Sequence, residues 1–572
     1  MNAPFNLMNQ YRRGDIAASR LRKDLLGRWF VCVFLLSALL IPEILAMSDG
    51  FQMPKVKEPS FSKSVINLAD FGGSGDGKTL NTEIIDHAIA SLVKTGGGKL
   101  VIPPGIWLTG PVRLQSNIEL HLEAGALLQF TSDYKQYPLM VLNIKGEKDV
   151  QSASPIFGED LENVAITGRG VIDGAGEAWR PVKKFKLTEA EWKALPASGF
   201  VDQSGSTWWP SREASEGGRL VQRLRASSSF DPKDYEPAHL FLRPRLLKLV
   251  NCRKVLLEGV TFQNSPSWTL NPTLCEDLTI RNVTARNPWY GQNTDALDVE
   301  SCRNVVIRDS TFDVGDDGIC LKSGLDVAGR HMGAPTENVW IENCIVYHAH
   351  GGFTIGSEIS GGVRNIGVNN CLFMGTDIGL RFKSARGRGG VVEKIYVANV
   401  RMTSIPGEAI NFSMYYGGRA PLDASGEPAA GGKGVPVDAG TPQFRDIYIE
   451  NVICRGARTA VLLQGLPEMP IRGIHLKNVS ISSQEGMVWM DAENITCENV
   501  DIKNTKGPVL SLTHATNVVI DHLTYPANVV AVIEAQGDQN GDIIIKNTDR
   551  KVATEDFILT NGASASSFQI KP

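Results

Sequence analysis

The stretch Asn304-Val305-Val306-Ile307-Arg308-Asp309-Ser310-Thr311-Phe312 decides the fold, because the chain repeats its pattern many times. Residues 254–262 and 277–285 have the same pattern, and the starts 254, 277 and 304 are 23 and 27 residues apart. Alternating apolar residues over five or six positions predict strands rather than helices. Repetition at this period predicts a solenoid. Further units begin at Asn338, Asn365, Lys394, Asp446, Gly473, Asn494, Asn517 and Asp542.

One column of the repeat indicates which solenoid is present. The sixth residue is usually asparagine, which tolerates the left-handed backbone of a sharp turn and can hydrogen-bond from coil to coil. The pattern therefore predicts an all-β fold, a right-handed single-stranded parallel β-helix of about a dozen coils. A β-sandwich is the alternative, but it has no fixed asparagine column. The column consists of Asn282, Asn343, Asn370, Asn399, Asn451, Asn478, Asn499 and Asn547, with Gly259, Asp309 and His522 as exceptions.

Length, charge and cysteine content fit this prediction. A solenoid accommodates 572 residues because each coil packs only on its neighbours. The net charge of −4 gives no indication of a nucleic acid or an anionic membrane surface as partner. Cys252, Cys275 and Cys302 occupy one column of successive coils, which favours buried free thiols. Adjacent coils are also within disulfide reach, so a disulfide is the alternative.

The N-terminal region is distinct from the repeats. A basic stretch precedes the apolar run 29–42, so residues 1–46 are predicted to be a secretory signal peptide or, as the alternative, a retained anchor. We accordingly expect a secreted or periplasmic protein, with a membrane contact only if this segment is retained. Residues 47–63 are predicted to be a linker, and residues 64–572 the β-helix domain.

Three further segments depart from the strand pattern. The sequence 82–93 has helical periodicity after a glycine-rich turn, and predicts an N-terminal helix that caps the first coil. A phosphate-binding loop does not fit the spacing before Lys78. Residues 175–245 interrupt the repeat and carry four of the ten tryptophans. This insertion is predicted to lie near the substrate cleft, either as a wall with aromatic platforms or as a packed side lobe. A second insertion, at roughly 417–443, is rich in glycine, proline and alanine and is predicted to be a loop.

Three aspartates in adjacent coils are candidate catalytic groups. Asp295 ends the segment Asn293-Thr294-Asp295, and Asp316 and Asp317 lie in Gly315-Asp316-Asp317-Gly318. The separation 316 − 295 = 21 predicts that residue 295 lies almost directly above residue 316. Flanking glycines would let the backbone bend so that both residues of the pair face one cleft. Clustered carboxylates cannot all ionise at low cost, so we expect at least one raised pKa. Calcium binding or a solvated turn is the alternative for an acidic cluster alone.

Cationic residues follow in later coils. His350 lies one or two coils beyond the aspartates, and Arg381 and Lys383 lie one coil after that. Arg381 and Lys383 are two positions apart and therefore share a strand face. Acids beside such a cationic shelf indicate a substrate that carries carboxylates.

Taken together, these motifs resemble the four-motif signature of the polygalacturonases, glycoside hydrolase family 28. The opening segments Asp70-Phe71-Gly72 and 96–105 are also similar to that family, and the resemblance covers about 64 to 550. Ala296, Ala349 and Phe382 depart from the family's usual residues, which bears on the fit of the substrate rather than on the reaction.

The resemblance implies metal-free hydrolysis of α-1,4-linked galacturonan with inversion, without a cofactor, by a monomer acting on pectin or oligogalacturonides. It implies that Asp317 is the general acid, that Asp295 and Asp316 activate water, and that His350 tunes or orients the acid. This agrees with a need for two carboxyl functions far enough apart to admit a water. Residues expected to bind substrate are Arg381, Lys383, Asn293 and Tyr416, with Tyr415 as an alternative to Tyr416.

Several alternatives stay open at this stage. The insertion and the segment 386–390, which resembles bacterial exo-acting members, favour attack at the chain end over internal attack. Rhamnogalacturonan is an alternative substrate. A polysaccharide lyase with the same fold would need calcium, and a non-catalytic β-helix adhesin would lack the ordered series of polar residues.

Overall fold

The computed structural model describes residues 51–418, 434–548 and 553–571. The predicted signal peptide or anchor, 1–46, lies outside the described residues, as does most of the loop predicted at 417–443. Within the described ranges, no helix is both long enough and apolar enough to span a bilayer.

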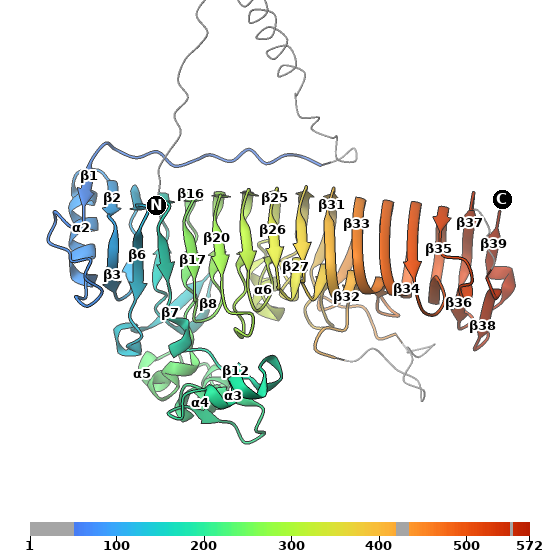
Figure 1. Cartoon of the computed structure of the whole chain (residues 1–572), viewed down its shortest axis with the longest axis horizontal. Helices are drawn as coiled ribbons and strands as arrows, with labels where there is room; N and C mark the ends of the chain where they lie inside the picture. The colour runs from blue at the N-terminus through green and yellow to red at the C-terminus, as the bar shows by residue number, and fades with distance from the viewer. Residues whose placement is uncertain (1–50, 419–433, 549–552, 572) are drawn as a thin grey trace, which may run out of the picture. The chain divides into compact units, whose positions relative to one another are not determined.

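The described chain winds into a parallel β-helix, as the repeat predicts. Successive strands add to three stacks of parallel strands, here named A, B and C, and the stacks run along one axis (Figure 1). Stack C carries the candidate site. The right-handed parallel β-helix predicted from the sequence is confirmed.

The strands of the three stacks are as follows. Stack A contains β1 (Val65–Asn67), β2 (Gly98–Ile102), β5 (Ile118–Leu122), β10 (Glu162–Gly168), β16 (Arg253–Glu258), β19 (Glu276–Arg281), β22 (Arg303–Arg308), β25 (Thr336–Glu342), β28 (Val363–Asn369), β31 (Val391–Ala398), β37 (Gly541–Lys546) and β39 (Phe568–Ile570). Stack B contains β3 (Gly105–Thr109), β6 (Ala126–Phe130), β11 (Val171–Asp173), β17 (Thr261–Gln263), β20 (Thr284–Arg286), β23 (Thr311–Asp313), β26 (Ile345–Tyr347) and β29 (Leu372–Met374). Stack C contains β4 (Val112–Arg113), β9 (Ile156–Glu159), β15 (Leu247–Val250), β18 (Leu270–Thr273), β21 (Leu297–Glu300), β24 (Ile319–Lys322), β27 (Gly351–Gly356), β30 (Ile378–Lys383), β36 (Ala531–Gln536) and β38 (Glu555–Thr560). The longer strands β32 (Arg401–Ser413), β33 (Gln443–Gln464), β34 (Ile471–Asn504) and β35 (Leu510–Thr524) pass from one stack to another.

The asparagine column forms the turn between stacks A and B. All eight asparagines have φ between 49° and 58°, and the three exceptions to the column are also left-handed. Neighbouring side chains bond from coil to coil: Asn370 Nδ2 donates to Asn343 Oδ1 at 2.8 Å, and Asn499 Nδ2 donates to Asn478 Oδ1 at 2.8 Å. Both properties predicted for the column are therefore confirmed.

The interior of the coils is apolar. Phe382 and Phe412 stack at 4.1 Å between ring centroids, and both are fully buried. All eight cysteines of the described residues are buried and free, including the column of Cys252, Cys275 and Cys302. The disulfide alternative is therefore wrong in this structure, and the thiols act as small apolar residues.

The helix predicted near the N-terminus is present as α2 (Thr82–Lys94), at the end of the stack beside β1 and β2 (Figure 1). Its buried face consists of Ile85, Ala88, Ile89 and Leu92. Its role as a cap stays an interpretation. The described part of the predicted linker contacts stack A: Phe51 lies 5.3 Å from Trp340 between ring centroids, and Glu58 forms an ion pair with Arg281.

The first insertion forms a lobe beside the stacks, and Figure 1 shows α3, α4, α5 and β12 gathered there. Trp179 and Trp208 are buried, whereas Trp192 and Trp209 are half-buried. The packed-lobe alternative therefore describes Trp179 and Trp208.

The elements of the lobe are η2 (Gly176–Ala178), β12 (Val182–Lys183), η3 (Lys184–Lys186), α3 (Glu189–Ala194), β13 (Phe200–Val201), β14 (Thr207–Trp209), α4 (Arg212–Ala226), α5 (Pro232–Tyr235) and η4 (Glu236–Phe241). Smaller elements outside the lobe are η1 (Tyr134–Gln136), the hairpin of β7 (Leu139–Ile144) and β8 (Glu147–Ser152), α6 (Asp326–Met332) and η5 (Ala565–Ser567).

Candidate active site

The three aspartates meet at the N-terminal ends of adjacent strands of stack C. Leu297 of β21 pairs with Ile319 of β24, an offset of 319 − 297 = 22, and the amide of Ala296 donates to the carbonyl of Asp317 at 2.9 Å. Asp295 is therefore level with Asp317. The sequence-based register, which placed residue 295 above residue 316, is off by one residue, because the connections that lead into β21 and β24 differ in length.

Close approach of the backbone explains the glycines that flank the pair. A Cβ atom at Gly315 would lie 2.5 Å from the carbonyl oxygen of Gly291, and one at Gly318 would lie 2.5 Å from a methyl group of Val346. Any other residue at either position would push the bend away from the coil before or after it. The bend allows Asp316 and Asp317 to reach one cluster although they are neighbours in sequence.

The carboxylates of Asp295, Asp316 and Asp317 lie close together and away from water. Each offers an oxygen within 4.8 Å of an oxygen of the other two. The three residues are 3 %, 9 % and 1 % exposed. Such a group can hold a water by several hydrogen bonds, and it is also the ligand type that a hard cation prefers.

Asp317 is bound by the cationic shelf of Arg381 and Lys383. Lys383 Nζ donates to Oδ2 at 2.7 Å, and Arg381 Nη1 donates to Oδ1 at 3.2 Å. The hydroxyl of Thr354 also donates to Oδ1, at 3.2 Å. Burial alone would raise the pKa of Asp317, but the charges of Lys383 and then Arg381 outweigh it and hold that pKa below its ordinary value. The shelf predicted from the spacing of Arg381 and Lys383 therefore points at Asp317.

His350 lies beside Asp316, in the next coil. Its Nδ1 is 3.1 Å from Asp316 Oδ1, and its Nε2 is 3.4 Å from Lys186 Nζ. Nε2 also lies 3.7 Å from Asp377 Oδ2, so the imidazole is placed between two carboxylates and the ammonium of Lys186. Burial opposes ionisation of Asp316, but the hydrogen bond with His350, together with the charges of His350 and Lys383, outweighs it, so the pKa of Asp316 is lowered.

Asp295 is the member of the cluster with a raised pKa. Burial is the main cause, and the nearby carboxylates of Asp298 and Asp316 add to it. The clustering of the carboxylates predicts at least one raised pKa, and Asp295 is the residue whose pKa is raised. Asp298 is fully buried three residues further on, and burial raises its pKa to about 7. Lys322 Nζ lies 3.5 Å from Asp298 and 3.0 Å from Glu358.

The two remaining predicted residues lie on opposite sides of the cluster. Tyr416 is 42 % exposed, with its ring centroid 5.0 Å from Lys383 Nζ, so it borders the shelf. Asn293 is two residues before Asp295, and its Oδ1 accepts from Arg243 Nη2 at 2.9 Å. All the predicted site residues are thus on the face that carries the carboxylates.

Four residues around the cluster were not predicted from the sequence. Thr354 pairs with Arg381 across the ladder, so aligning the strand ends would have found it. Asp298 and Lys322 lie on the exterior face of β21 and β24, where an alternating pattern places polar residues. Lys186 comes from the insertion, which has no repeat, so nothing in the pattern assigns it to the site.

Comparisons with known proteins agree with the geometry. The sequence model of glycosyl hydrolases family 28 matches residues 239–492, a range that contains the aspartates, His350 and the shelf. A probable polygalacturonase of Vitis vinifera is 30% identical over 424 residues, which are 73% of this chain and 74% of that protein. The exo-poly-alpha-D-galacturonosidase of Dickeya chrysanthemi is 27% identical over 360 residues, which are 62% of this chain and 57% of that protein.

A solved structure extends the likeness to three dimensions. The crystal structure of a hyperthermoactive exopolygalacturonase from Thermotoga maritima matches with a TM-score of 0.63 and 31% identity, over 78% of this chain and 93% of that one. Fold, ordered motifs and relatives point the same way. The chain therefore belongs to glycosyl hydrolases family 28 and is a glycoside hydrolase of the polygalacturonase type.

Proposed function

We propose that the protein hydrolyses α-1,4 bonds between galacturonate residues of pectin or oligogalacturonides, and that it attacks from the chain end. The observation that carries this proposal is the contact between the buried carboxylates and the cationic shelf. The carboxylates can move protons, and the shelf can bind a substrate that is itself a carboxylate. The named activities of the relatives from Dickeya chrysanthemi and Thermotoga maritima support exo action.

In the proposed reaction, Asp317 gives its proton to the leaving oxygen as the glycosidic bond breaks. Asp295 and Asp316 hold the attacking water, and one of them accepts its proton. His350 orients Asp316 through the contact at its Nδ1. No metal or cofactor takes part in this scheme.

The low pKa of Asp317 in the free protein needs an explanation if this residue is the acid. Lys383 and Arg381 stabilise its ionised form. A galacturonate carboxylate that binds the same two cations competes with Asp317 and also adds a negative charge beside it. Both effects raise the pKa of Asp317. Substrate binding would thus prepare the acid for proton transfer.

Inversion rests on the family resemblance rather than on spacing. The carboxylate oxygens lie within 4.8 Å of one another, closer than the roughly 6.5–9.5 Å that is usual for inverting glycosidases. The sequence-based expectation is only that the carboxyl functions are far enough apart to admit a water. A water can still contact two of these oxygens at once, with ordinary hydrogen bonds of about 2.8 Å.

The remaining parts of the proposal concern binding and location. Arg381, Lys383 and Tyr416 would bind the sugar on the leaving side, while Asn293 lies on the other side of the cluster. We further propose that the protein acts outside the cytoplasm, because residues 1–46 have the pattern of a secretory signal peptide or anchor, and, separately, that it is a monomer.

Product analysis tests the proposal. Homogalacturonan, rhamnogalacturonan and oligogalacturonides are digested separately, and products are followed by mass spectrometry from the first minutes. We expect short saturated galacturonides from homogalacturonan at once, while long chains persist. A ladder of intermediate lengths contradicts exo action, and products formed from rhamnogalacturonan alone contradict the substrate.

A further inference from the structure

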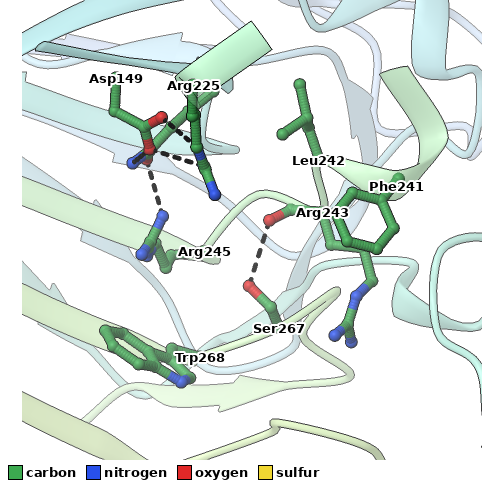
Figure 2. Close-up of a pocket in the computed structure, with 9 residues that line it drawn as sticks. Asp149, Arg225, Phe241, Leu242, Arg243, Arg245, Ser267 and Trp268 are labelled. Carbon is green, nitrogen blue, oxygen red and sulfur yellow. Dashed lines mark hydrogen bonds and ion pairs between the residues drawn. The ribbon is translucent and has the colours of Figure 1, made fainter. Parts of the chain in front are cut away.

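A pocket adjoins the carboxylate cluster on the side opposite the shelf. It encloses about 200 Å³, less than the roughly 300–1,000 Å³ of pockets for drug-sized ligands, which suits one pyranose ring. Figure 2 shows its residues converging from the hairpin strand β8, from α4, from the segment after η4 and from the start of β18. The lining residues used below are Asp149, Arg225, Arg243, Arg245 and Trp268.

The pocket is one coil before Asp295. Leu270 of β18 pairs with Leu297 of β21, so Trp268 is level with Asp295 in the neighbouring coil, about 4.8 Å away along the axis. The amide of Thr269 donates to the carbonyl of Asp295 at 2.8 Å. The order along the axis is therefore pocket, Asp295, Asp317 and shelf.

Two arginines of the pocket have hydrogen bonds but no counter-ion. Arg243 donates to the carbonyls of Pro266 and Gln292 and to the side chain of Asn293. Arg245 donates to Gln151 Oε1 at 2.7 Å, and its buried Nε has no partner. Within the described ranges, neither guanidinium has a carboxylate within the 4.0 Å of an ion pair.

A third arginine at the same pocket provides the contrast. Arg225 binds Asp149 with two hydrogen bonds, at 2.9 and 3.0 Å, so its charge is already compensated. Half-buried guanidinium groups without a counter-ion are unfavourable unless an anion joins them. The Arg245 guanidinium lies 4.9 Å from the Trp268 ring centroid and Lys322 Nζ lies 4.8 Å from it, so two cations lie against this aromatic ring. Cations next to an aromatic face suit a sugar ring with a carboxylate.

We propose that Arg243, Arg245 and Trp268 bind the galacturonate residue at the non-reducing end of the substrate, with its carboxylate on the two arginines. This inference rests on the proposed function. Asp317 as the acid must contact the oxygen of the leaving sugar, so the shelf beside it takes the reducing side. The pocket, beyond Asp295, then takes the other side of the bond. Arg225 and Asp149 lie outside the family-matched range 239–492, whereas the two arginines and Trp268 lie within it.

The experiment combines a change in the protein with a change in the ligand. The ligands are trigalacturonate and the same trisaccharide with its non-reducing terminal carboxylate reduced to the alcohol. Binding is measured by calorimetry on Asp317→Asn, which does not require turnover, with and without Arg245→Gln. A failure of the proposed reaction therefore leaves this test intact.

We expect loss of the terminal carboxylate to weaken binding about ten- to a hundred-fold, the range of a charge-assisted hydrogen bond. Arg245→Gln should weaken trigalacturonate binding by a similar factor. This variant should then bind trigalacturonate and the terminally reduced trisaccharide with nearly the same affinity. Arg245→Lys keeps the cation and should retain most of the preference for the intact ligand. Arg364→Gln, an exposed arginine of β28 paired with Glu337, is the control and should change nothing.

The proposal is overturned if the losses from Arg245→Gln and from the reduced ligand multiply, because the two groups then act independently. It is also overturned if the protein with an unchanged pocket binds trigalacturonate and the terminally reduced trisaccharide with the same affinity. Circular dichroism of each variant checks the fold, and Arg245→Lys decides the question if Arg245→Gln does not fold.

Discussion

The two sides of the carboxylate cluster both carry cations, but on the pocket side two of these cations have no counter-ion among the residues that the structure describes. On the shelf side, Arg381 and Lys383 bind Asp317 at 3.2 and 2.7 Å. On the pocket side, Arg243 and Arg245 donate only to neutral oxygens. In the proposed binding mode, a substrate carboxylate would displace Asp317 on the shelf side, whereas in the pocket it would meet two arginines that have no counter-ion.

This difference assigns different tasks to the two sides. Displacement at the shelf makes binding depend on the state of the acid, so binding and proton transfer are coupled there. The pocket has no such coupling, and its contacts affect only how firmly the chain end is held. Changes on the shelf side should therefore alter turnover, and changes in the pocket should alter affinity.

The largest effect is expected at the residue that the shelf binds. Asp317→Asn keeps the shape of the side chain but cannot donate a proton, so turnover on oligogalacturonide should fall by about 10²–10⁴-fold. Reducing-end assays measure the rate, and circular dichroism checks that the fold is intact. Near-normal activity of a folded variant would remove Asp317 from the role of acid.

A smaller loss is expected when the shelf loses one charge. Lys383→Met should reduce the use of galacturonides about ten- to a hundred-fold, since a charge-assisted pair contributes roughly 1.5–3 kcal/mol. It should have little effect on a methyl-esterified oligosaccharide, which has no charge to pair.

Kinetics on both substrates provide the measurement, and Lys477→Met, at an exposed ion pair with Glu498, is the matched control. Equal losses on the acidic and the esterified substrate would mean that the shelf is structural.

The third prediction concerns stability and pH. The pKa of Asp298 is raised to about 7 in the folded protein, so between its ordinary value and 7 the folded state holds a proton that the unfolded state has released. The free energy of unfolding should therefore fall as pH rises through this window. Asp298→Asn stays neutral and should flatten the slope, by up to about 1.4 kcal/mol per pH unit. Urea unfolding at pH 5 and pH 7 measures it, and an unchanged slope shows that Asp298 does not titrate there.

No effect is expected from a chelator. The carboxylates are assigned to proton transfer, and Lys383 and Arg381 already neutralise Asp317. Activity should be the same with and without EDTA in the reducing-end assay. Loss of activity that calcium restores would instead favour a lyase.

Much of the fold can be predicted from the sequence because each coil repeats the same local requirements. The asparagine column marks a left-handed turn, since asparagine adopts that backbone more readily than most residues. A second left-handed column, at the first residue of each unit, was not predicted. Lys254 has φ 52° and Lys394 has φ 55° there, and lysine gives no hint of such a backbone.

The site is predictable only as far as the repeat extends. The aspartates, His350 and the shelf follow from their order along the coils. The register is off by one residue because the connections between stacks B and C differ in length from coil to coil, and no repeat fixes their length. Lys186 and Arg243 reach the cluster from the insertion and its end, where the absence of a repeat leaves no register to compare.

Proton NMR of the first products tests the central claim most directly. Saturated trigalacturonate is digested in the spectrometer, and the new anomeric signals are recorded before mutarotation. Hydrolysis with inversion predicts that the β-anomer appears first and that no olefinic proton forms. An α-anomer that appears first would contradict inversion, and an olefinic signal would show a lyase in place of a hydrolase.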